Sequence, residues 1–156
     1  MKNKIREGSE GDIPEILRLN KKLADQHAKT DNYFLPGSET RKAVKDWLES
    51  VFEDDSALVL VVEEGDGLGG YFIGLIEQTK PFIRPDFEGR ISDAYLEPRI
   101  RGKGFARLAY ERFQEWFKDN DINSIRLSVH SENEDAISAW RSLGFEEYMK
   151  RMKVDI

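Results

Sequence analysis

The segment Arg99–Ala106 reads RIRGKGFA and places two glycines among basic residues, which are Arg99, Arg101 and Lys103. It lies between a strand candidate, residues 89–98, and a helical apolar face that begins at Phe105. Because glycine adopts positive φ freely, Gly102 and Gly104 let successive backbone N–H groups converge on an anion at the positive end of the following helix. The segment therefore predicts an anion-binding turn. A strand-to-helix turn that merely requires two glycines is the alternative.

Two nucleotide-binding patterns can be compared with the same turn. A dinucleotide fingerprint requires G-x-G-x-x-G, and Arg107 stands where its third glycine would fall. The G-x-x-x-x-G-K-[ST] pattern of a P-loop is not met either. The turn therefore does not indicate a Rossmann or P-loop site.

Composition limits the remaining classes of function. With 156 residues and 39% hydrophobic content, the chain can bury one core, and we expect a single domain over residues 1–156. The net charge of -6 disfavours a nucleic-acid partner and suits cationic ones. Absence of cysteine excludes disulfides and a thiolate nucleophile, and two histidines are too few for most metal sites, so no metal is expected. The sequence contains neither an apolar leader nor a membrane-length apolar run, so we expect a cytoplasmic protein without a membrane partner.

Apolar periodicity and turn residues predict the order of elements. Asp12 and Glu15 have the spacing of a capping box at the start of a first helix. The later elements expected are a helix over 44–52, a hairpin of strands 57–64 and 71–79, a strand over 89–98, a helix from Phe105, a strand over 122–129, a helix over 134–143 that Gly144 would cap, and an extended segment over 145–156. Whether the last segment forms one strand or two is left open.

Two segments resemble the GNAT superfamily of N-acetyltransferases. Residues 91–111, ISDAYLEPRIRGKGFARLAYE, resemble its motif A, and the pattern [QR]-x-x-G-x-[GA] occurs twice, beginning at Arg99 and at Arg101. Residues 133–147, NEDAISAWRSLGFEE, resemble its motif B, N-x-x-A-x-x-x-Y-x-x-x-G-F, except that the tyrosine position holds Trp140. The order of elements in nearly the whole chain is also similar to that of the family.

The resemblance implies an α/β fold with a mixed central sheet of about six to seven strands, helices on both faces, and a splay between the fourth and fifth strands. It implies acetyl-CoA as cosubstrate, with the pantetheine arm in the splay and hydrogen-bonded to the main chain near Tyr95 and Leu96. Asn133 would contact that arm, with a helix N-cap as its alternative role. The loop residues expected at the pyrophosphate are Arg101, Gly102, Lys103, Gly104, Phe105 and Ala106.

The catalytic positions of the family are altered in this chain. Attack requires a neutral amine, but an alkylamine has a pKa of about 10.4, so a base must accept a proton. Trp140 replaces the tyrosine acid of many relatives and is expected instead to bind the cosubstrate, with its ring as a wall of the pantetheine channel. Serines stand where some relatives carry a glutamate, at Ser92 and Ser128. The remaining candidates are Asp93, His130 and Tyr148. Since neighbouring strand residues point to opposite faces, Asp93 could also face away from the site.

The resemblance places the acceptor beside the first two helices and the loop between them. Acidic and aromatic side chains there suit a cationic amine, namely Asp25, His27, Asp31 and Tyr33, although a solvated loop is the alternative. We expect direct acetyl transfer to a primary amine of a small cationic molecule, without a covalent enzyme intermediate. The alternatives are acetylation of a peptide N-terminus or lysine, a silent acyl-CoA-binding module, and a scaffold without a ligand. A homodimer is left open.

Overall fold

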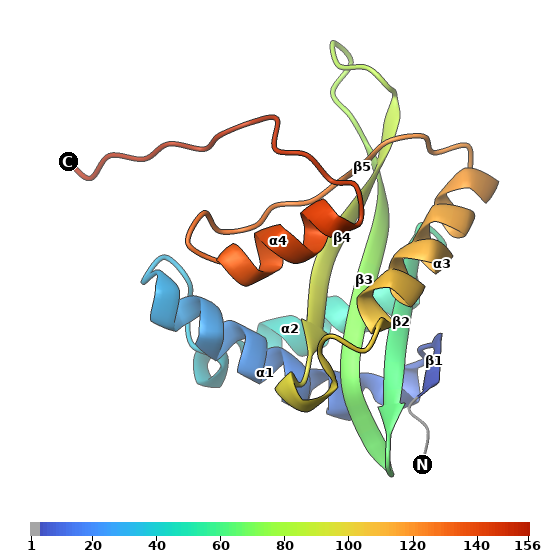
Figure 1. The fold of residues 1–156 in the computed structure, drawn as a ribbon, viewed down its shortest axis with the longest axis vertical. Coiled ribbons are helices and arrows are strands. Elements are labelled where there is room, and N and C mark those ends of the chain that lie inside the picture. Colours follow the sequence, from blue (N-terminus) through green and yellow to red (C-terminus); the bar gives the residue numbers. More distant parts are fainter. Residues whose placement is uncertain (1–3) are drawn as a thin grey trace.

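The computed structural model describes residues 4–156 and shows helices packed on both faces of a central sheet (Figure 1). Within these residues the sheet has five strands in the order β1-β2-β3-β4-β5. Their bounds are β1 Lys4–Glu7, β2 Ala57–Glu64, β3 Gly67–Gln78, β4 Phe87–Leu96 and β5 Ile125–Arg126. Neighbouring strands are antiparallel except for β4 and β5, which are parallel. The sheet is therefore mixed, as the sequence predicts.

The helices are divided between the two faces of the sheet. They are α1 Ile13–Thr30, α2 Gly37–Phe52, α3 Phe105–Asp119 and α4 Glu134–Ser142, with short 3-10 turns at Glu10–Asp12 and Pro98–Ile100. Helices α1 and α2 share one buried cluster with the strands, and α3 shares another, against which Trp140 of α4 also packs. The expected helices on both faces are confirmed.

The apolar run of β2 follows from burial on both faces. Val59 and Val61 face the core beneath α1 and α2, whereas Leu60 and Val62 face the core beneath α3. Such a strand has no polar face, which explains why its sequence is continuously apolar rather than alternating. A two-residue turn, Gly65–Asp66, joins β2 to β3, so β3 begins earlier than the expected residue 71.

The fourth and fifth strands separate after a short region of pairing. Gly89 pairs with Ile125 and Arg90 with Arg126, and beyond this register no pairing of β4 with β5 is present in residues 4–156. The second half of β4, which ends at Leu96, consequently has an open edge. The expected splay is confirmed at this edge.

The number of strands is smaller than the sequence predicts. Only Ile125–Arg126 of the expected strand 122–129 pairs with the sheet. Residues 145–156 form no helix or strand, and their last part projects from the molecule (Figure 1). A strand requires a partner for its backbone N–H and C=O groups. Most of residues 122–129 has no partner in β4, and residues 145–156 do not pair along the outer edge of β5. The expectation of six to seven strands is thus wrong for the described residues, which form five.

The expected capping box at α1 does not form. The Asp12 carboxylate instead accepts hydrogen bonds from both terminal nitrogens of Arg6, at 2.8 and 2.9 Å, and from the backbone N–H of Ser9 at 2.9 Å. Glu15 accepts from Leu68 N at 3.0 Å. Both acids therefore join α1 to its surroundings. At the other end of the chain, Gly144 follows α4 at φ +102°, as its predicted role requires.

Candidate acetyl-CoA and acceptor site

The glycine turn after β4 has the backbone conformation of an anion site. Gly102 and Gly104 have φ of +73° and +89°, values that disfavour a side chain. The space where their Cβ atoms would stand is open to 4 Å. Gly104 is the N-cap of α3 and supplies no side-chain cap, so first-turn N–H groups are available to a ligand. These features fit a phosphate group approaching the backbone.

Two of the basic residues of this turn already contact protein groups. Arg101 Nε donates to Leu96 O at 2.8 Å, and the guanidinium lies 5.6 Å from the ring centre of Tyr95. Arg99 pairs with Glu64. The Leu96 carbonyl, which the sequence predicts to bind the cosubstrate, thus already accepts one hydrogen bond, from Arg101, and has a second lone pair for another donor. The Tyr95 and Leu96 side chains pack in the cores on opposite faces of the sheet.

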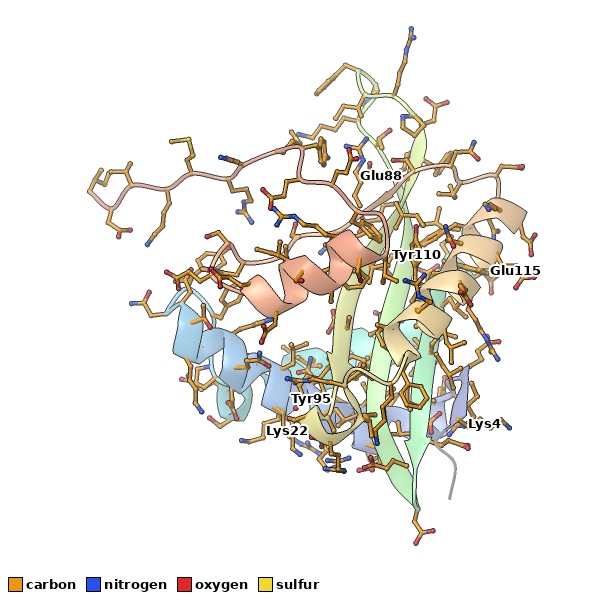
Figure 2. The ribbon with its side chains drawn as sticks, viewed as in Figure 1. Lys4, Lys22, Glu88, Tyr95, Tyr110 and Glu115 are labelled. Carbon is orange, nitrogen blue, oxygen red and sulfur yellow. The ribbon has the colours of Figure 1, made fainter. Side chains whose placement is uncertain are left out.

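A buried carboxylate connects the end of β4 to α1. Glu97 is only 2% exposed, and its Oε1 lies 2.5 Å from Lys22 Nζ and 3.1 Å from Arg18 Nη1. Burial opposes ionisation of Glu97, but these two cations outweigh it and hold its pKa below the usual range. Lys22 and Tyr95 lie at the same end of the sheet in Figure 2. The ion pairs therefore fix α1 beside the glycine turn.

A pocket of about 200 Å³ lies where the C-terminal half of α1 meets the loop before α4. The residues that line it are Gln26, His27, Thr30, Phe34, His130, Glu132 and Asn133. His130 Nε2 lies 3.1 Å from Asp31 Oδ2, so the loop after α1 is joined to the segment after β5. The structure therefore brings together His27, Asp31, His130 and Asn133, which the sequence predicts as site residues from distant parts of the chain.

Asp93 faces α1 rather than the opposite side of the sheet. It stands beside Ile73 in the strand register, and the pairing shifts directly afterwards, so that Ser92 is the additional residue of a β-bulge. Its Oδ2 accepts a hydrogen bond of 3.0 Å from the hydroxyl of Tyr71. The Tyr71 oxygen in turn accepts from Asn20 Nδ2 of α1 at 3.0 Å. Asp93 therefore belongs to a polar chain under α1.

The charges of Asp93 and His27 influence each other. Burial raises the pKa of Asp93, and the Tyr71 hydrogen bond and the nearby His27 oppose this rise. Burial also lowers the pKa of His27, with Asp93 acting in the opposite direction and His130 adding to the decrease. A neutral imidazole in the pocket and a carboxylate with increased proton affinity are thus close enough to interact, an arrangement suited to proton transfer.

Asn133 and Trp140 have structural contacts of their own. Asn133 Oδ1 accepts from Ala136 N at 3.2 Å and caps α4, which leaves its side-chain NH₂ free of this contact. Trp140 meets Phe145 edge to face, with ring centres 5.3 Å apart, and Tyr110 of α3 contacts the same phenylalanine. The indole therefore packs between α4 and α3, next to the open edge of β4.

Besides Asp31 and Asp93, three further predicted catalytic and acceptor residues lie outside the pocket lining. The Asp25 carboxylate binds Lys21 Nζ at 2.9 Å and Gly37 N at 2.8 Å, and so joins α1 to α2. Tyr33 is 72% exposed beside Phe34. The hydroxyl of Tyr148 contacts Arg126 of β5, which pairs with Arg90 near the start of β4. Their predicted roles in acceptor binding and catalysis stay predictions.

Sequence reasoning missed Tyr71, Asn20 and Glu97. Tyr71 stands in an apolar strand that is buried on both faces, so no alternation identifies its partner side. Asn20 is one of several polar residues of α1. The strand-ending Glu97 before Pro98 could have been noticed as a charge at the boundary of the glycine turn.

Residues 4–156 contain neither a metal-binding cluster nor a membrane-spanning helix. No group of three or more His, Asp or Glu side chains in this range is arranged to hold a metal ion. No helix in the same range is long and apolar enough to span a membrane.

Comparison with known proteins shows the family of this chain. The sequence model of the acetyltransferase (GNAT) family matches residues 23–145, which include the C-terminal part of α1, the glycine turn and α4. The chain belongs to the GNAT family. Its sequence is 27% identical over 143 residues to thialysine N-epsilon-acetyltransferase of Sus scrofa, an alignment that covers 90% of this chain and 82% of that protein.

Solved structures agree with the GNAT fold. A tetramutant of the BH1408 protein from Bacillus halodurans has a TM-score of 0.81 and 26% identity, with 98% of this chain and 99% of that chain covered. A predicted acetyltransferase from Clostridium acetobutylicum, solved with acetyl-CoA, has a TM-score of 0.79 and 17% identity, with 99% and 96% covered. As a GNAT enzyme, the protein is an acetyl-CoA-dependent N-acetyltransferase.

Proposed function

We propose that the protein transfers the acetyl group of acetyl-CoA directly to a primary amine of a small cationic molecule. The pocket at the end of α1 carries this proposal. Among the described residues that line it, Glu132 is acidic and none is lysine or arginine, and Asp31 lies at its border. An ammonium group would be attracted there and a carboxylate would meet no fixed positive charge.

The size of the pocket favours a small acceptor over a peptide. About 200 Å³ corresponds to roughly seven water molecules at about 30 Å³ each, which suits a short aliphatic amine. The name of the Sus scrofa relative, which specifies acetylation of the ε-nitrogen of thialysine, is consistent with a small amine acceptor. Acetylation of a peptide N-terminus or lysine is the alternative that the assay below separates.

The glycine turn would hold the cosubstrate. The open left-handed turn and the uncapped first turn of α3 fit a pyrophosphate, which Gly102 and Gly104 would admit to the backbone. Lys103 would add positive charge at the same turn. Acetyl-CoA supplies the acetyl group as an activated thioester. The open edge of β4 would receive the pantetheine arm by strand-like hydrogen bonding near Leu96.

Asp93 would accept the proton that the acceptor ammonium loses before attack. Its proton affinity is increased by burial, and a water molecule would bridge the distance to the pocket, where neutral His27 lies. The amine nitrogen then forms a bond to the thioester carbon, the C–S bond breaks with its electron pair on sulfur, and the thiolate leaves while the new amide nitrogen gives up its surplus proton to water. Because a thiol of this kind has a pKa of about 8.5, its thiolate leaves at neutral pH without a strong acid.

A thiol-release assay with acetyl-CoA tests the proposed function. The panel would contain diamines, lysine analogues, and peptides with a free N-terminus or an internal lysine. We expect release of coenzyme A with a small amine and little with the peptides. Release with peptides alone would establish the alternative acceptor. A thermal shift with coenzyme A but no turnover on any acceptor would show an acyl-CoA-binding module and overturn the proposal.

A further inference from the structure

We infer that Tyr71 is a positioning residue, which holds one oxygen of the Asp93 carboxylate so that the other oxygen receives the proton during acetyl transfer. This inference rests on the proposed function, because it assigns a role within the same site. Tyr71 is fully buried, and its hydroxyl lies 3.0 Å from Asp93 Oδ2. A rigid ring in a close-packed core holds that hydroxyl in one place.

Asn20 determines the direction of the Tyr71 hydrogen bond. A phenolic hydroxyl can donate one hydrogen and also accept. Asn20 Nδ2 can only donate, and it lies 3.0 Å from the Tyr71 oxygen, so the hydroxyl hydrogen is left to point at Asp93. Asn20 belongs to α1, Tyr71 to β3 and Asp93 to β4, so three elements fix the orientation of the carboxylate.

The hydrogen bond leaves a defined atom for proton transfer. Since Oδ2 accepts from Tyr71, Oδ1 is the oxygen that remains to receive a proton from the acceptor through water. A donated hydrogen bond stabilises the ionised carboxylate and limits the rise in proton affinity that burial causes. Other groups that act on Asp93 are His27 of α1, with Arg90 and Ser92 of β4. They remain in place when only the Tyr71 hydroxyl is removed.

The variant Tyr71→Phe removes the hydroxyl and keeps the ring. The pH dependence of kcat/KM and a carboxyl ¹³C NMR titration of aspartate-labelled protein without substrate would be recorded for this variant, the parent and Asp93→Asn. We expect the acidic limb of the rate profile and the NMR midpoint of Asp93 to rise by about half to one pH unit. We also expect kcat on the plateau to fall by about three- to tenfold, with little change in KM for acetyl-CoA.

Tyr110→Phe is the matched control. Tyr110 lies on α3, against the opposite face of the sheet, and its oxygen accepts from Gln114 Nε2 at 3.1 Å (Figure 2). This variant also loses one hydroxyl from a half-buried ring, and its rate profile and NMR midpoint should match those of the parent. If Tyr71→Phe does not fold, Asn20→Leu removes the donor that directs the hydroxyl, and a smaller rise in the same direction is expected.

The two measurements separate this inference from the proposed function. An unchanged NMR midpoint for Asp93 in a folded Tyr71→Phe protein would overturn the inference, whatever the activity. If Asp93→Asn keeps the parental rate profile, Asp93 is not the base, and the proposed mechanism fails even where the NMR midpoint responds to Tyr71. Two results together would support both the inference and the proposed function. In Tyr71→Phe the NMR midpoint of Asp93 and the acidic limb of the rate profile both rise, and in Asp93→Asn that acidic limb is absent.

Discussion

Lys22 Nζ lies 2.5 Å from Glu97 Oε1, so an ion pair fastens α1 to the residue that directly follows β4. Arg18 contacts the same oxygen at 3.1 Å, and the carboxylate is almost fully buried. Removing one partner of a buried ion pair lowers the free energy of unfolding more than removing one partner of an exposed ion pair. The partial exposure of Lys22 and Arg18 reduces this effect. The pair joins α1, which borders the proposed acceptor pocket, to the segment that precedes the proposed cosubstrate turn.

Glu97→Gln is expected to lower the free energy of unfolding by about 1 to 2 kcal/mol, measured by urea titration. Because the pKa of Glu97 is below its ordinary 4.5 in the fold, the stabilisation is complete above about pH 4.5 and is lost as the pH falls through the lowered value. Glu49→Gln is the control, since Glu49 is exposed and lies 4.0 Å from Lys45. Equal midpoints of urea unfolding for Glu97→Gln and Glu49→Gln would contradict the prediction.

Gly104→Val should remove most of the affinity for coenzyme A, measured by calorimetry, because a β-branched side chain opposes φ of +89° and fills the open approach to the turn. We expect a loss of about tenfold or more. Gly65→Val is the matched control, because Gly65 also has a positive φ, of +58°, with open space around it, in the β2–β3 turn. Parental affinity in a folded Gly104→Val protein would exclude the turn as the pyrophosphate site.

Trp140→Phe should retain most of the turnover and show a modest loss of coenzyme A affinity. The indole packs on Phe145 and cannot act as a practical proton donor, so the smaller aromatic ring of phenylalanine should suffice for turnover. Steady-state kinetics with the acceptor that the thiol-release assay identifies would measure this. Abolished turnover with intact coenzyme A binding would show that Trp140 has a chemical role.

Asp93→Asn should reduce turnover at pH 7 by about a hundredfold and much less near pH 10, where the amine is already neutral in larger part. The pKa of Asp93 is raised above 3.8 in the fold, so its ionisation destabilises the folded state as the pH rises through that raised value. The variant should therefore have a higher Tm than the parent at pH 7. Asp66→Asn, in the β2–β3 turn, should change neither the rate nor the Tm.

The sequence allowed the glycine turn, the helices and the motifs to be predicted because each depends on local pattern. Positive φ at Gly104 and the apolar face of α3 are properties of short segments. The orientation of Asp93 cannot be predicted from the whole strand. Asp93 shares the α1 face with Tyr95 by alternation, but a β-bulge at Ser92 places Ile91 on the opposite face, and alternation cannot locate such an inserted residue.

Strand propensity and strand pairing also differ in what they determine. The β-branched composition of residues 122–129 predicts an eight-residue strand, yet only Ile125–Arg126 finds a partner in β4. Propensity describes one chain segment, whereas pairing depends on where its neighbours end. The partnership of Tyr71 with Asp93 and Asn20 was hidden for the same reason, because it arises from the packing of three separate elements.

The projecting end of the chain has a consequence for solubility. From residue 151, charged residues at 151, 153 and 155 alternate with Met152, Val154 and Ile156, and all three apolar side chains are highly exposed. An apolar, extended segment of this kind can pair with the unprotected edge of another sheet and lead to aggregation. The interspersed charges Arg151 and Lys153 oppose such pairing between copies by repulsion, which the opposite charge of Asp155 reduces. High salt, which screens that repulsion, should therefore favour precipitation of this otherwise acidic protein.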